Sequence, residues 1–385
     1  MESFTPSEPS WAPPVYADTR AAWTGIYREA PDIPIQIEAA AYRGRPVSFQ
    51  IIHPWTKPRA APPPETPAWK RAADFLTVAL FLFALPGAAL LALKNLRLGR
   101  GDLKGAFRLA FYLLAIRLLI WVLHCHHVPG LQEISLFNLS LAYALYSFGM
   151  AWLYYVALEP YLRRLWPQML VTWVRLLGGR IRDPLIGRDA LVGAALGVTI
   201  VLLVLLHHRA HEWLGLEPLT PDEIGSVQQQ LVGLTGLRFA LAQVLWVMRN
   251  EVLDWMGGPM ITLLLLRILL RRPWPALVGW LVIGTMWVMP RSGHWMVGLS
   301  LSLLTVSLVA TVLFRFGMLC ALLGLITAGL LAICPPEADL TAWYATPTMI
   351  SLALVAGMAI YGFRVTLAGR PLMRDLLAEA PDFRS

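Results

Sequence analysis

Seven of the eight histidines lie at or beside the ends of apolar segments, where imidazole groups could bind a metal ion or a proton. His207 and His211 are four residues apart, a spacing that places both rings on one face of a helix. Neutral imidazole is a common ligand for zinc and copper, and it titrates near neutral pH. One hypothesis is therefore a zinc, copper or proton sensor; the alternative is that these amphipathic rings simply lie at the membrane interface. The seven are His124, His126, His127, His207, His208, His211 and His294.

Charged side chains also occur inside apolar segments, namely Arg117, Arg238, Arg249, Glu251 and Asp254. Charge within a bilayer is costly, so such residues usually face the protein interior and pair with one another. They could form a translocation or proton pathway, or a structural ion pair such as Arg117 with Glu251 or Asp254. The run from Arg249 to Asp254 equally fits a helix end at the interface.

Catalytic sequence motifs are absent. The chain has no Gly-x-Ser-x-Gly elbow, no His-Glu-x-x-His and no phosphate-binding loop, so an enzyme activity of its own is not indicated. Cys125, Cys320 and Cys334 have no paired spacing and predict neither a disulfide framework nor a zinc motif. Gly193 and Gly197 form a small-xxx-small pattern that is typical of close helix packing.

The composition indicates a membrane protein. Hydrophobic residues make up 57% of the 385 residues, charged residues only 15%, and the mean hydropathy is +0.57. A soluble domain usually carries about 25% charged residues. The net charge of +8 is explained by cytoplasmic loops rich in Lys and Arg, and no basic stripe with interleaved aromatics suggests nucleic-acid binding.

Nine apolar runs approach the ~20 residues that a bilayer requires. They are 73–93, 107–123, 137–158, 190–206, 250–270, 274–289, 296–314, 317–334 and 347–363. A tenth segment, 228–248, is diluted by polar residues and fits either the interface or the bundle interior. The predicted fold is an all-α polytopic membrane protein of eight to ten helices over 73–372, since backbone groups in lipid must pair within helices.

The first 72 residues differ from the rest. Residues 33–38 and 47–51 alternate apolar and polar side chains around Gly44, which predicts a β-hairpin in a juxtamembrane segment. Residues 54–67 are rich in proline and predict a stiff linker. At the other end of the chain, the polar residues 373–385 predict a disordered tail.

Clusters of arginine and lysine assign the loops to sides of the membrane. By the positive-inside rule, loops 94–108 and 159–189, the turn near 271 and the C-terminus are cytoplasmic. If 73–93 spans fully, the N-terminal segment lies outside the cell, although Lys70 and Arg71 favour the inside. Pro86-Gly87 could instead break this helix into a re-entrant piece. The side of the N-terminus therefore stays open.

Loop 159–189 carries a possible docking surface. Asp183-Pro184 fits a helix N-cap followed by the first helical residue, and Asp189 could cap the fourth span. Its cations could hold anionic lipid heads or the acidic face of a partner protein. The residues of this surface are Arg163, Arg164, Arg175, Arg180, Arg182, Asp183, Arg188 and Asp189.

Several sequence segments resemble those of a known group of proteins. They include 95–102 (NLRLGRGD), 157–164 (ALEPYLRR), 182–189 (RDPLIGRD), 361–371 near the end, and 16–23 and 38–46 upstream. Together they resemble the C-terminal membrane region of bacterial transmembrane serine/threonine protein kinases, over roughly residues 11–372. A kinase domain has no counterpart here, since the chain lacks a Gly-rich loop with a strand lysine, a His-Arg-Asp loop and an Asp-Phe-Gly motif.

The resemblance implies a sensory or anchoring module in the bacterial inner membrane, working with a separately encoded protein kinase or another signalling protein. It also implies a cytoplasmic N-terminus. The alternative function is a transporter or channel-like protein that uses the charges near 250, although no internal repeat supports it. An intramembrane enzyme is a third hypothesis, weakened by the missing motifs.

Overall fold

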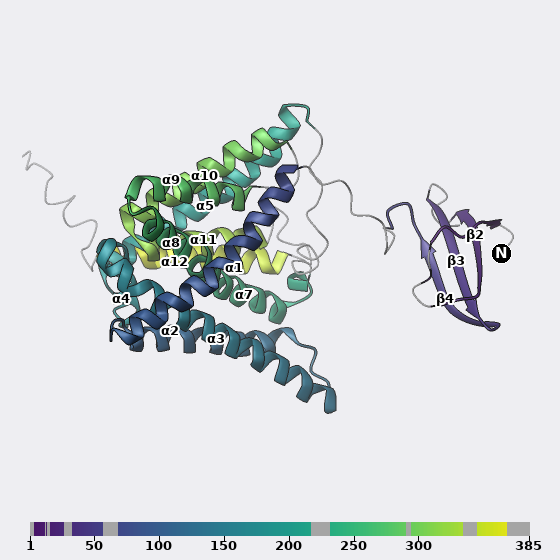
Figure 1. Ribbon diagram of the computed structural model, residues 1–385, viewed down its shortest axis with the longest axis horizontal. Coiled ribbons are helices and arrows are strands. Elements are labelled where there is room, and N and C mark those ends of the chain that lie inside the picture. Colours follow the sequence, from purple (N-terminus) through teal and green to yellow (C-terminus); the bar gives the residue numbers. More distant parts are fainter. Residues whose placement is uncertain are drawn as a thin grey trace, which may run out of the picture. The chain divides into compact units, whose positions relative to one another are not determined.

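The computed structural model describes residues 4–11, 13, 16–26, 33–56, 68–216, 232–289, 294–333 and 345–367. These fall into two compact units, an N-terminal unit up to Ala68 and a helical unit from Trp69 onward (Figure 1). Three predictions lie mostly or wholly outside the described residues: the Pro-rich linker 54–67, the tail 373–385 and Cys334.

The N-terminal unit is a four-stranded antiparallel sheet in the order β1-β2-β3-β4. Its strands are β1 (Thr5–Ser7), β2 (Thr19–Ile26), β3 (Pro34–Tyr42) and β4 (Arg45–Ile52). The predicted hairpin is confirmed as β3–β4. Its two turn residues, Arg43 and Gly44, both have positive φ angles (50° and 76°), as a tight hairpin that follows strand twist requires. Strand β2 was not predicted, because its sequence lacks a period-2 alternation.

A buried carboxylate ties the segment before β2 to the sheet. Glu38 is 8% exposed and accepts hydrogen bonds from the backbone nitrogens of Ser10 (2.8 Å) and Trp11 (3.1 Å). The buried apolar residues described in this unit are Ala22, Ile35, Ala40 and Ile52, which form a small core. The charge-assisted hydrogen bonds of Glu38, which are stronger than neutral ones, add to this small core.

Within the described residues, each predicted apolar run is helical apart from a residue at its ends. The helices are α1 (Ala68–Arg97), α2 (Leu103–His124), α3 (Leu131–Leu165), α4 (Pro167–Leu177), α5 (Pro184–Trp213), α7 (Leu237–Trp255), the π-helix η1 (Met256–Met260), α8 (Ile261–Leu270), α9 (Pro273–Val288), α10 (Trp295–Phe316), α11 (Met318–Ile333) and α12 (Ala345–Thr366).

Among the described residues, six helical segments are long and apolar enough to cross a membrane. They are α2, α3, α5, the continuous segment Leu237–Leu270, α10 and α12. Helices α9 and α11 are apolar but shorter. The predicted segments 228–248 and 250–270 are therefore not two elements: their described part is one 34-residue rod, α7-η1-α8. The membrane class is as predicted, while the six segments fall below the predicted eight to ten spans.

Of the two alternatives for residues 73–93, the one with a helix break at Pro86-Gly87 is wrong. Helix α1 runs unbroken for 30 residues with Pro86 inside it. Proline removes one backbone hydrogen bond, a loss that neighbouring helices can compensate within a membrane bundle. Ala84, Ala88 and Ala92 are all buried, so the part of this helix around Pro86 packs against the bundle.

Glycines allow α5 to approach α11 closely. A Cβ atom at Gly193 would lie 2.9 Å from the Cys320 carbonyl oxygen, and one at Gly197 would lie 2.4 Å from Thr327 Cβ. Only residues without a side chain permit this separation. The predicted role of Gly193 and Gly197 in helix packing is confirmed.

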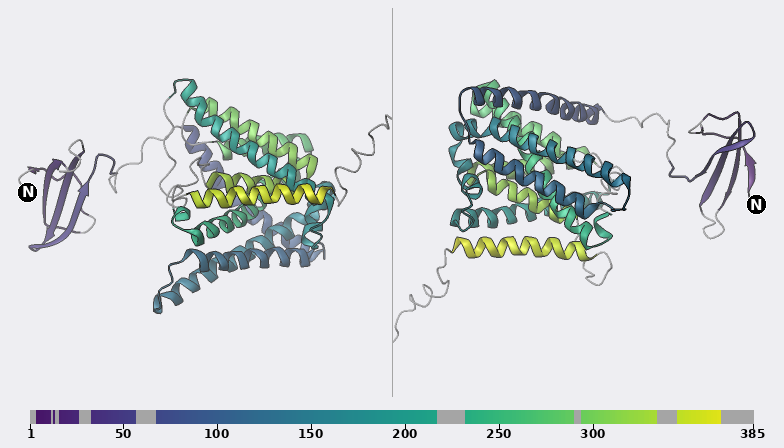
Figure 2. Two further views of the ribbon diagram at one scale, coloured as in Figure 1. Left: turned by 180° about the vertical axis from the view of Figure 1, so that it is seen from behind. Right: turned by 90° about the horizontal axis from the view of Figure 1, so that it is seen from below.

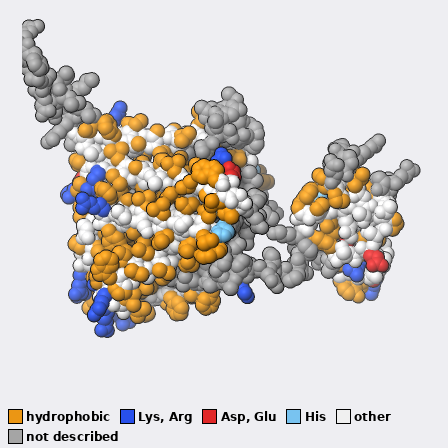
Figure 3. Space-filling model, turned by 90° about the horizontal axis from the view of Figure 1, so that it is seen from above, with side chains coloured by type: hydrophobic (Ala, Val, Ile, Leu, Met, Phe, Trp, Pro, Cys, Tyr) orange, Lys and Arg blue, Asp and Glu red, His pale blue; other side chains and the backbone are white. Residues whose placement is uncertain are grey.

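The two ends of the bundle differ in charge. The last turns of α1, α3, α8, α10 and α12 carry Lys or Arg, whereas those of α2 and α5 carry His124 and His211. The long helices lie side by side with their axes roughly aligned (Figure 2). Because neighbouring helices alternate in direction, most of the Lys and Arg side chains visible in Figure 3 gather at one end of the helical unit. We call this the basic end, and the opposite end the histidine end.

Candidate functional site

Sequence segments far apart in the chain meet at the basic end. The Asn95 side chain donates to the Val156 carbonyl oxygen at 2.9 Å, which joins the end of α1 to α3. The Asp102 backbone nitrogen donates to Glu159 Oε2 at 3.3 Å. Glu159 is buried and pairs with the exposed Arg163 at 2.5 Å. The sequence segments 95–102 and 157–164 therefore belong to one network of contacts.

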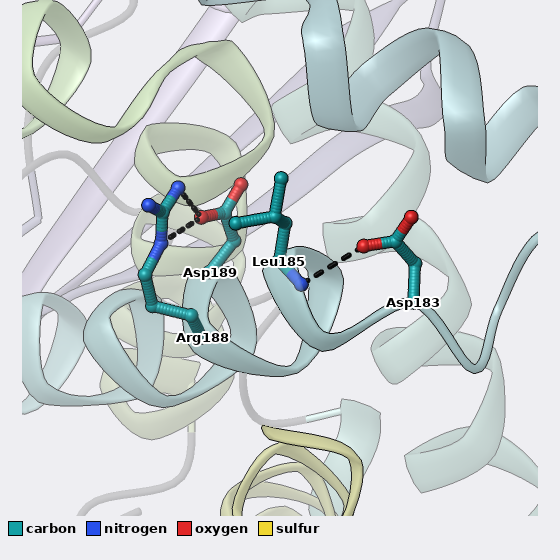
Figure 4. Close-up of polar contacts among 4 residues, drawn as sticks. All are labelled: Asp183, Leu185, Arg188 and Asp189. Carbon is teal, nitrogen blue, oxygen red and sulfur yellow. Dashed lines mark hydrogen bonds and ion pairs between the residues drawn. The ribbon is translucent and has the colours of Figure 1, made fainter. Parts of the chain in front are cut away.

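Asp183 begins α5, as predicted. Its Oδ1 accepts a hydrogen bond from the Leu185 backbone nitrogen at 2.9 Å (Figure 4), and Pro184 follows as the first helical residue. Its Oδ2 lies 2.7 Å from Arg175 Nη1. The backbone hydrogen bond from Leu185, with a further contribution from Arg175, lowers the pKa of the Asp183 carboxyl group.

The prediction that Asp189 caps this helix is wrong. Because Asp183 already caps it, α5 begins at Pro184 and Asp189 lies inside its second turn, fully buried. Asp189 Oδ1 accepts from Arg188 Nε at 3.1 Å and from Arg188 Nη2 at 2.8 Å (Figure 4). The Arg188 guanidinium also lies over the Phe316 ring, 5.4 Å from its centroid. This pair binds α5 to the end of α10 instead of capping a helix.

Helix α4 was not predicted. It lies within the segment assigned as a loop, and its buried face consists of Met169, Leu170, Thr172 and Trp173. A proline at its first position and the apolar spacing of this face were the available signals. Of the predicted docking residues, Arg164, Arg180 and Arg182 are exposed and form no ion pair with any described residue. They leave uncompensated positive charge at the basic end.

The predicted ion pair of Arg117 with Glu251 or Asp254 is wrong. Within the described part of the chain no such contact forms, and the Arg117 guanidinium instead lies over the Tyr143 ring, 5.4 Å from its centroid. The run from Arg249 to Asp254 is also not a helix end, because it lies inside the 34-residue rod. Sequence spacing alone could not reveal which helix faces Arg117.

Arg249 is held by polar side chains. Its Nε and Nη2 donate to Ser147 Oγ at 3.1 Å and 2.7 Å, and its Nη1 donates to Asn250 Oδ1 at 2.5 Å. Arg238 lies 11 residues earlier, at the start of α7, where Nη2 is 3.3 Å from His126 Nδ1. The five predicted intramembrane charges are therefore not one cluster.

A cavity of about 420 Å³ lies between α2, α3 and α7. We call it the arginine cavity; its lining includes Arg117, His124, Ser140, Tyr143, Tyr146, Gln243, Trp246 and Arg249. It extends from the last residue of α2 to Arg249, which is 12 residues, or about 18 Å, into the rod that starts at Leu237. It thus reaches from the histidine end deep into the bundle.

Two smaller cavities continue along the same rod. One of about 140 Å³ shares Tyr146 and Arg249 with the arginine cavity and also contains Asp254. The other, of about 220 Å³, shares Asp254 and contains Glu251. Four of the five predicted intramembrane charges, all except Arg238, are thus distributed along a row of adjoining cavities.

The π-helix η1 lies beside these cavities. Pro259 has no backbone N–H and cannot bond to the Trp255 carbonyl oxygen as an α-helix requires, which accounts for the wider turn. The Pro259 carbonyl oxygen accepts from Trp280 Nε1 at 2.8 Å. A Cβ at Gly257 would lie 2.4 Å from Tyr154, so η1 packs tightly on α3. Such π-turns are frequent at functional sites.

The seven histidines separate into two groups. His207 and His211 lie 4.7 Å apart between ring centroids, both buried, and His211 Nε2 accepts from the His294 backbone nitrogen at 2.8 Å. His208 lies 6.0 Å from His207. Among the described residues, no three His, Cys, Asp or Glu side chains are placed to hold a metal ion.

The second group lies around the end of α2. His124 and His126 both contact the Phe239 ring. His127 Nδ1 lies 2.5 Å from Glu133 Oε1, and its Nε2 lies 3.0 Å from the Val122 carbonyl oxygen. The hydrogen bond to Glu133, followed by that to the carbonyl, raises the pKa of His127. These contacts connect α2, α3 and α7 at the mouth of the arginine cavity.

No known family model, curated protein or solved structure matches the chain. The class that the fold defines is a mostly helical protein, with helices long and apolar enough to span a membrane and a small N-terminal β-sheet.

Proposed function

We propose that the chain is the membrane-embedded sensory module of a bacterial signalling system, with its basic end in the cytoplasm. The positive-inside rule supports this orientation in the inner membrane. Three of the sequence segments that resemble transmembrane serine/threonine kinases lie at that end, namely 95–102, 157–164 and 182–189. The exposed Arg164, Arg180 and Arg182 there form the expected docking surface for a kinase or another signalling protein.

The observation that carries the proposal is the path of the rod α7-η1-α8. Its first half lines the arginine cavity, its π-turn packs on Tyr154 of α3, and its last turn lies at the basic end. Helix α3 follows a parallel route, from the cavity residue Ser140 to Glu159 in the basic-end network. A ligand that moves either helix in the cavity therefore changes the docking surface.

The coupling can be tested by filling the cavity. In a chain whose cysteines are replaced by alanine, Ile181→Cys reports on the basic end through its rate of maleimide labelling. Ser140→Phe should change that rate about fivefold or more, the usual lower range of coupling between sites. Ser300→Phe is the matched control, because Ser300 is exposed on α10.

Ala242→Leu, a smaller filling of the same cavity, repeats the test without a large ring. Each variant is first checked for native helix content. Equal labelling rates in the unmodified chain and in correctly folded cavity-filled variants would contradict the sensory proposal and leave only an anchoring role.

The proposed orientation of the helical unit can be tested by labelling from outside the cell. Val128→Cys at the histidine end should react with an impermeant maleimide in spheroplasts, and Ile181→Cys at the basic end should not. Tyr16→Cys reports on which side the N-terminal segment lies. All three positions are exposed. Protection of Tyr16→Cys would favour the cytoplasmic N-terminus that the resemblance implies.

A second candidate function is transport. The row of adjoining cavities beside a π-turn, with charges deep in the bundle, is what favours it. Proteoliposomes with an entrapped pH-sensitive dye measure proton movement under an imposed gradient. A flux that exceeds that of protein-free liposomes and falls on Asp254→Asn would favour transport; background flux would favour the sensory module.

A further inference from the structure

We infer that the arginine cavity binds an oxyanion, a carboxylate or phosphate group held between Arg117 and Arg249. This inference names the ligand class of the cavity on which the proposed function rests. The inference depends on the charge, the hydrogen-bond donors and the dimensions of the cavity. It does not require that ligand binding in the cavity alters the docking surface at the basic end.

The cavity carries positive charge without a compensating acid. Arg117 and Arg249 line it together with His124, and none of its lining residues is Asp or Glu. Asp254 lines the adjoining cavity and forms no ion pair with either arginine, and Glu133 near the cavity mouth is paired with His127. An uncompensated guanidinium inside a bilayer is costly, so an anion that enters gains a large favourable interaction.

The two arginines have different roles. Arg249 is oriented by its hydrogen bonds to Ser147 and Asn250. Arg117, by contrast, donates no hydrogen bond to any described residue, and its guanidinium lies over the face of Tyr143. A guanidinium has five N–H donors in a planar fork that matches carboxylate and phosphate oxygens. Arg117 is therefore the donor that a ligand satisfies, and Arg249 is a positioned second cation.

The size and walls of the cavity suit the organic part of such a ligand. Its volume of about 420 Å³ lies within the range of ligand pockets, about 300–1,000 Å³. Tyr143, Tyr146 and Trp246 supply apolar surface with polar edges. The oxyanion could belong to a small carboxylate from water or to the head group of an anionic lipid. The recognition chemistry is the same for both, and the experiment separates them.

The test uses the full chain in phosphatidylcholine nanodiscs, in a buffer whose only anion is chloride. Benzoate and inorganic phosphate are titrated, and phosphatidylglycerol is added in a third arm. Thermal unfolding gives the stabilisation, and calorimetry gives the dissociation constant. We compare the unmodified chain with Arg117→Met and Arg249→Met; Arg182→Met, which removes an exposed basic-end arginine, is the charge-matched control.

At least one of the three anions should raise the Tm of the unmodified chain and of Arg182→Met. Arg117→Met should bind that anion about tenfold to hundredfold more weakly, the usual effect of losing a charged hydrogen bond. It should also be no less stable than the unmodified chain before anion is added, because it lacks the uncompensated charge. A response to benzoate or phosphate indicates a free oxyanion, and a response to phosphatidylglycerol alone indicates a lipid head group.

The inference is overturned if none of the three anions shifts the Tm of the unmodified chain, or if Arg117→Met and Arg249→Met bind as tightly as Arg182→Met. These outcomes differ from failure of the sensory proposal. Anion binding with unchanged labelling of Ile181→Cys would uphold the site and reject the coupling.

Discussion

Replacing Gly197 by alanine should destabilise the bundle, although alanine normally favours a helix. The added Cβ would lie 2.4 Å from Thr327 Cβ and 2.6 Å from the Gly324 carbonyl oxygen. Optimal contacts between carbon atoms are about 3.5–4.0 Å. Both neighbours belong to or adjoin the α11 backbone and cannot rotate away, so α5 and α11 must separate locally.

Gly357→Ala in α12 is the matched control. A Cβ there would meet no described atom within 4 Å, so this variant gains only the helix-propensity benefit of up to about 1 kcal/mol. That benefit is common to both variants and cancels in the comparison. The difference in the free energy of unfolding is then the overpacking cost alone, about 1–3 kcal/mol.

The assay is reversible unfolding in mixed micelles of dodecyl maltoside and SDS, followed by far-ultraviolet circular dichroism. Gly197→Ala should unfold at a lower SDS fraction than Gly357→Ala. Adding Thr327→Gly to Gly197→Ala should recover part of the loss, since it removes the contacts with the Thr327 side chain and leaves the one with the Gly324 carbonyl oxygen. If Gly197→Ala is as stable as Gly357→Ala, the close packing of α5 on α11 is refuted.

Other substitutions test the site. Trp280→Phe removes the donor to the π-turn carbonyl oxygen, and leaving a buried acceptor unpaired should lower the free energy of unfolding by about 1–3 kcal/mol. Glu133→Gln should lower the pKa of His127 toward its ordinary value, which nitrogen-15 NMR of labelled histidine measures. In the unmodified chain, the His127–Glu133 pair should stabilise the folded protein fully at a pH below the unfolded-state pKa of His127. This stabilisation should be lost as the pH rises through the raised pKa of the folded state. Asp183→Ala should lower the free energy of unfolding by about 1 kcal/mol through loss of the N-cap. Because folding lowers the pKa of Asp183, this contribution should be present above the unfolded pKa and disappear as pH falls through the folded one.

Each of these has a distinct contrary outcome. Trp274→Phe replaces an exposed tryptophan, so equal stability of the two Trp variants would argue against the hydrogen bond to η1. If the pKa of His127 is the same in Glu133→Gln as in the unmodified chain, the contact between His127 and Glu133 at the cavity mouth is contradicted. An Asp183→Ala difference that is the same at acidic and neutral pH would show that the carboxylate charge is not involved.

Local patterns were sufficient for the elements of the fold. Alternation around the Gly44 turn predicted the β3–β4 hairpin, and apolar runs predicted the long helices, because each signal lies within one element. Asp183-Pro184 predicted the start of α5 for the same reason, since a cap satisfies backbone groups of its own first turn. Helix α4 was missed because its apolar face is short and lies within an arginine-rich segment.

The candidate site was only partly predictable. The sequence indicated that Arg117 and Arg249 are unusual, because charges within apolar segments require a partner or a cavity. It could not show that they line the same cavity, since they lie on α2 and α7 and are 132 residues apart. It also could not show that the histidines separate into two groups.

By itself, then, the sequence determined a membrane protein, its helical segments, its hairpin and the basic character of one set of loops. Hydropathy, turn chemistry and charge act over a few residues, so these signals can be recognised from the local sequence. Only the tertiary structure decided that Asp189 is buried, that Arg117 forms no ion pair with an acid among the described residues, and that three cavities adjoin one helical rod. These facts depend on which helices pack together, and packing joins residues that no local pattern connects.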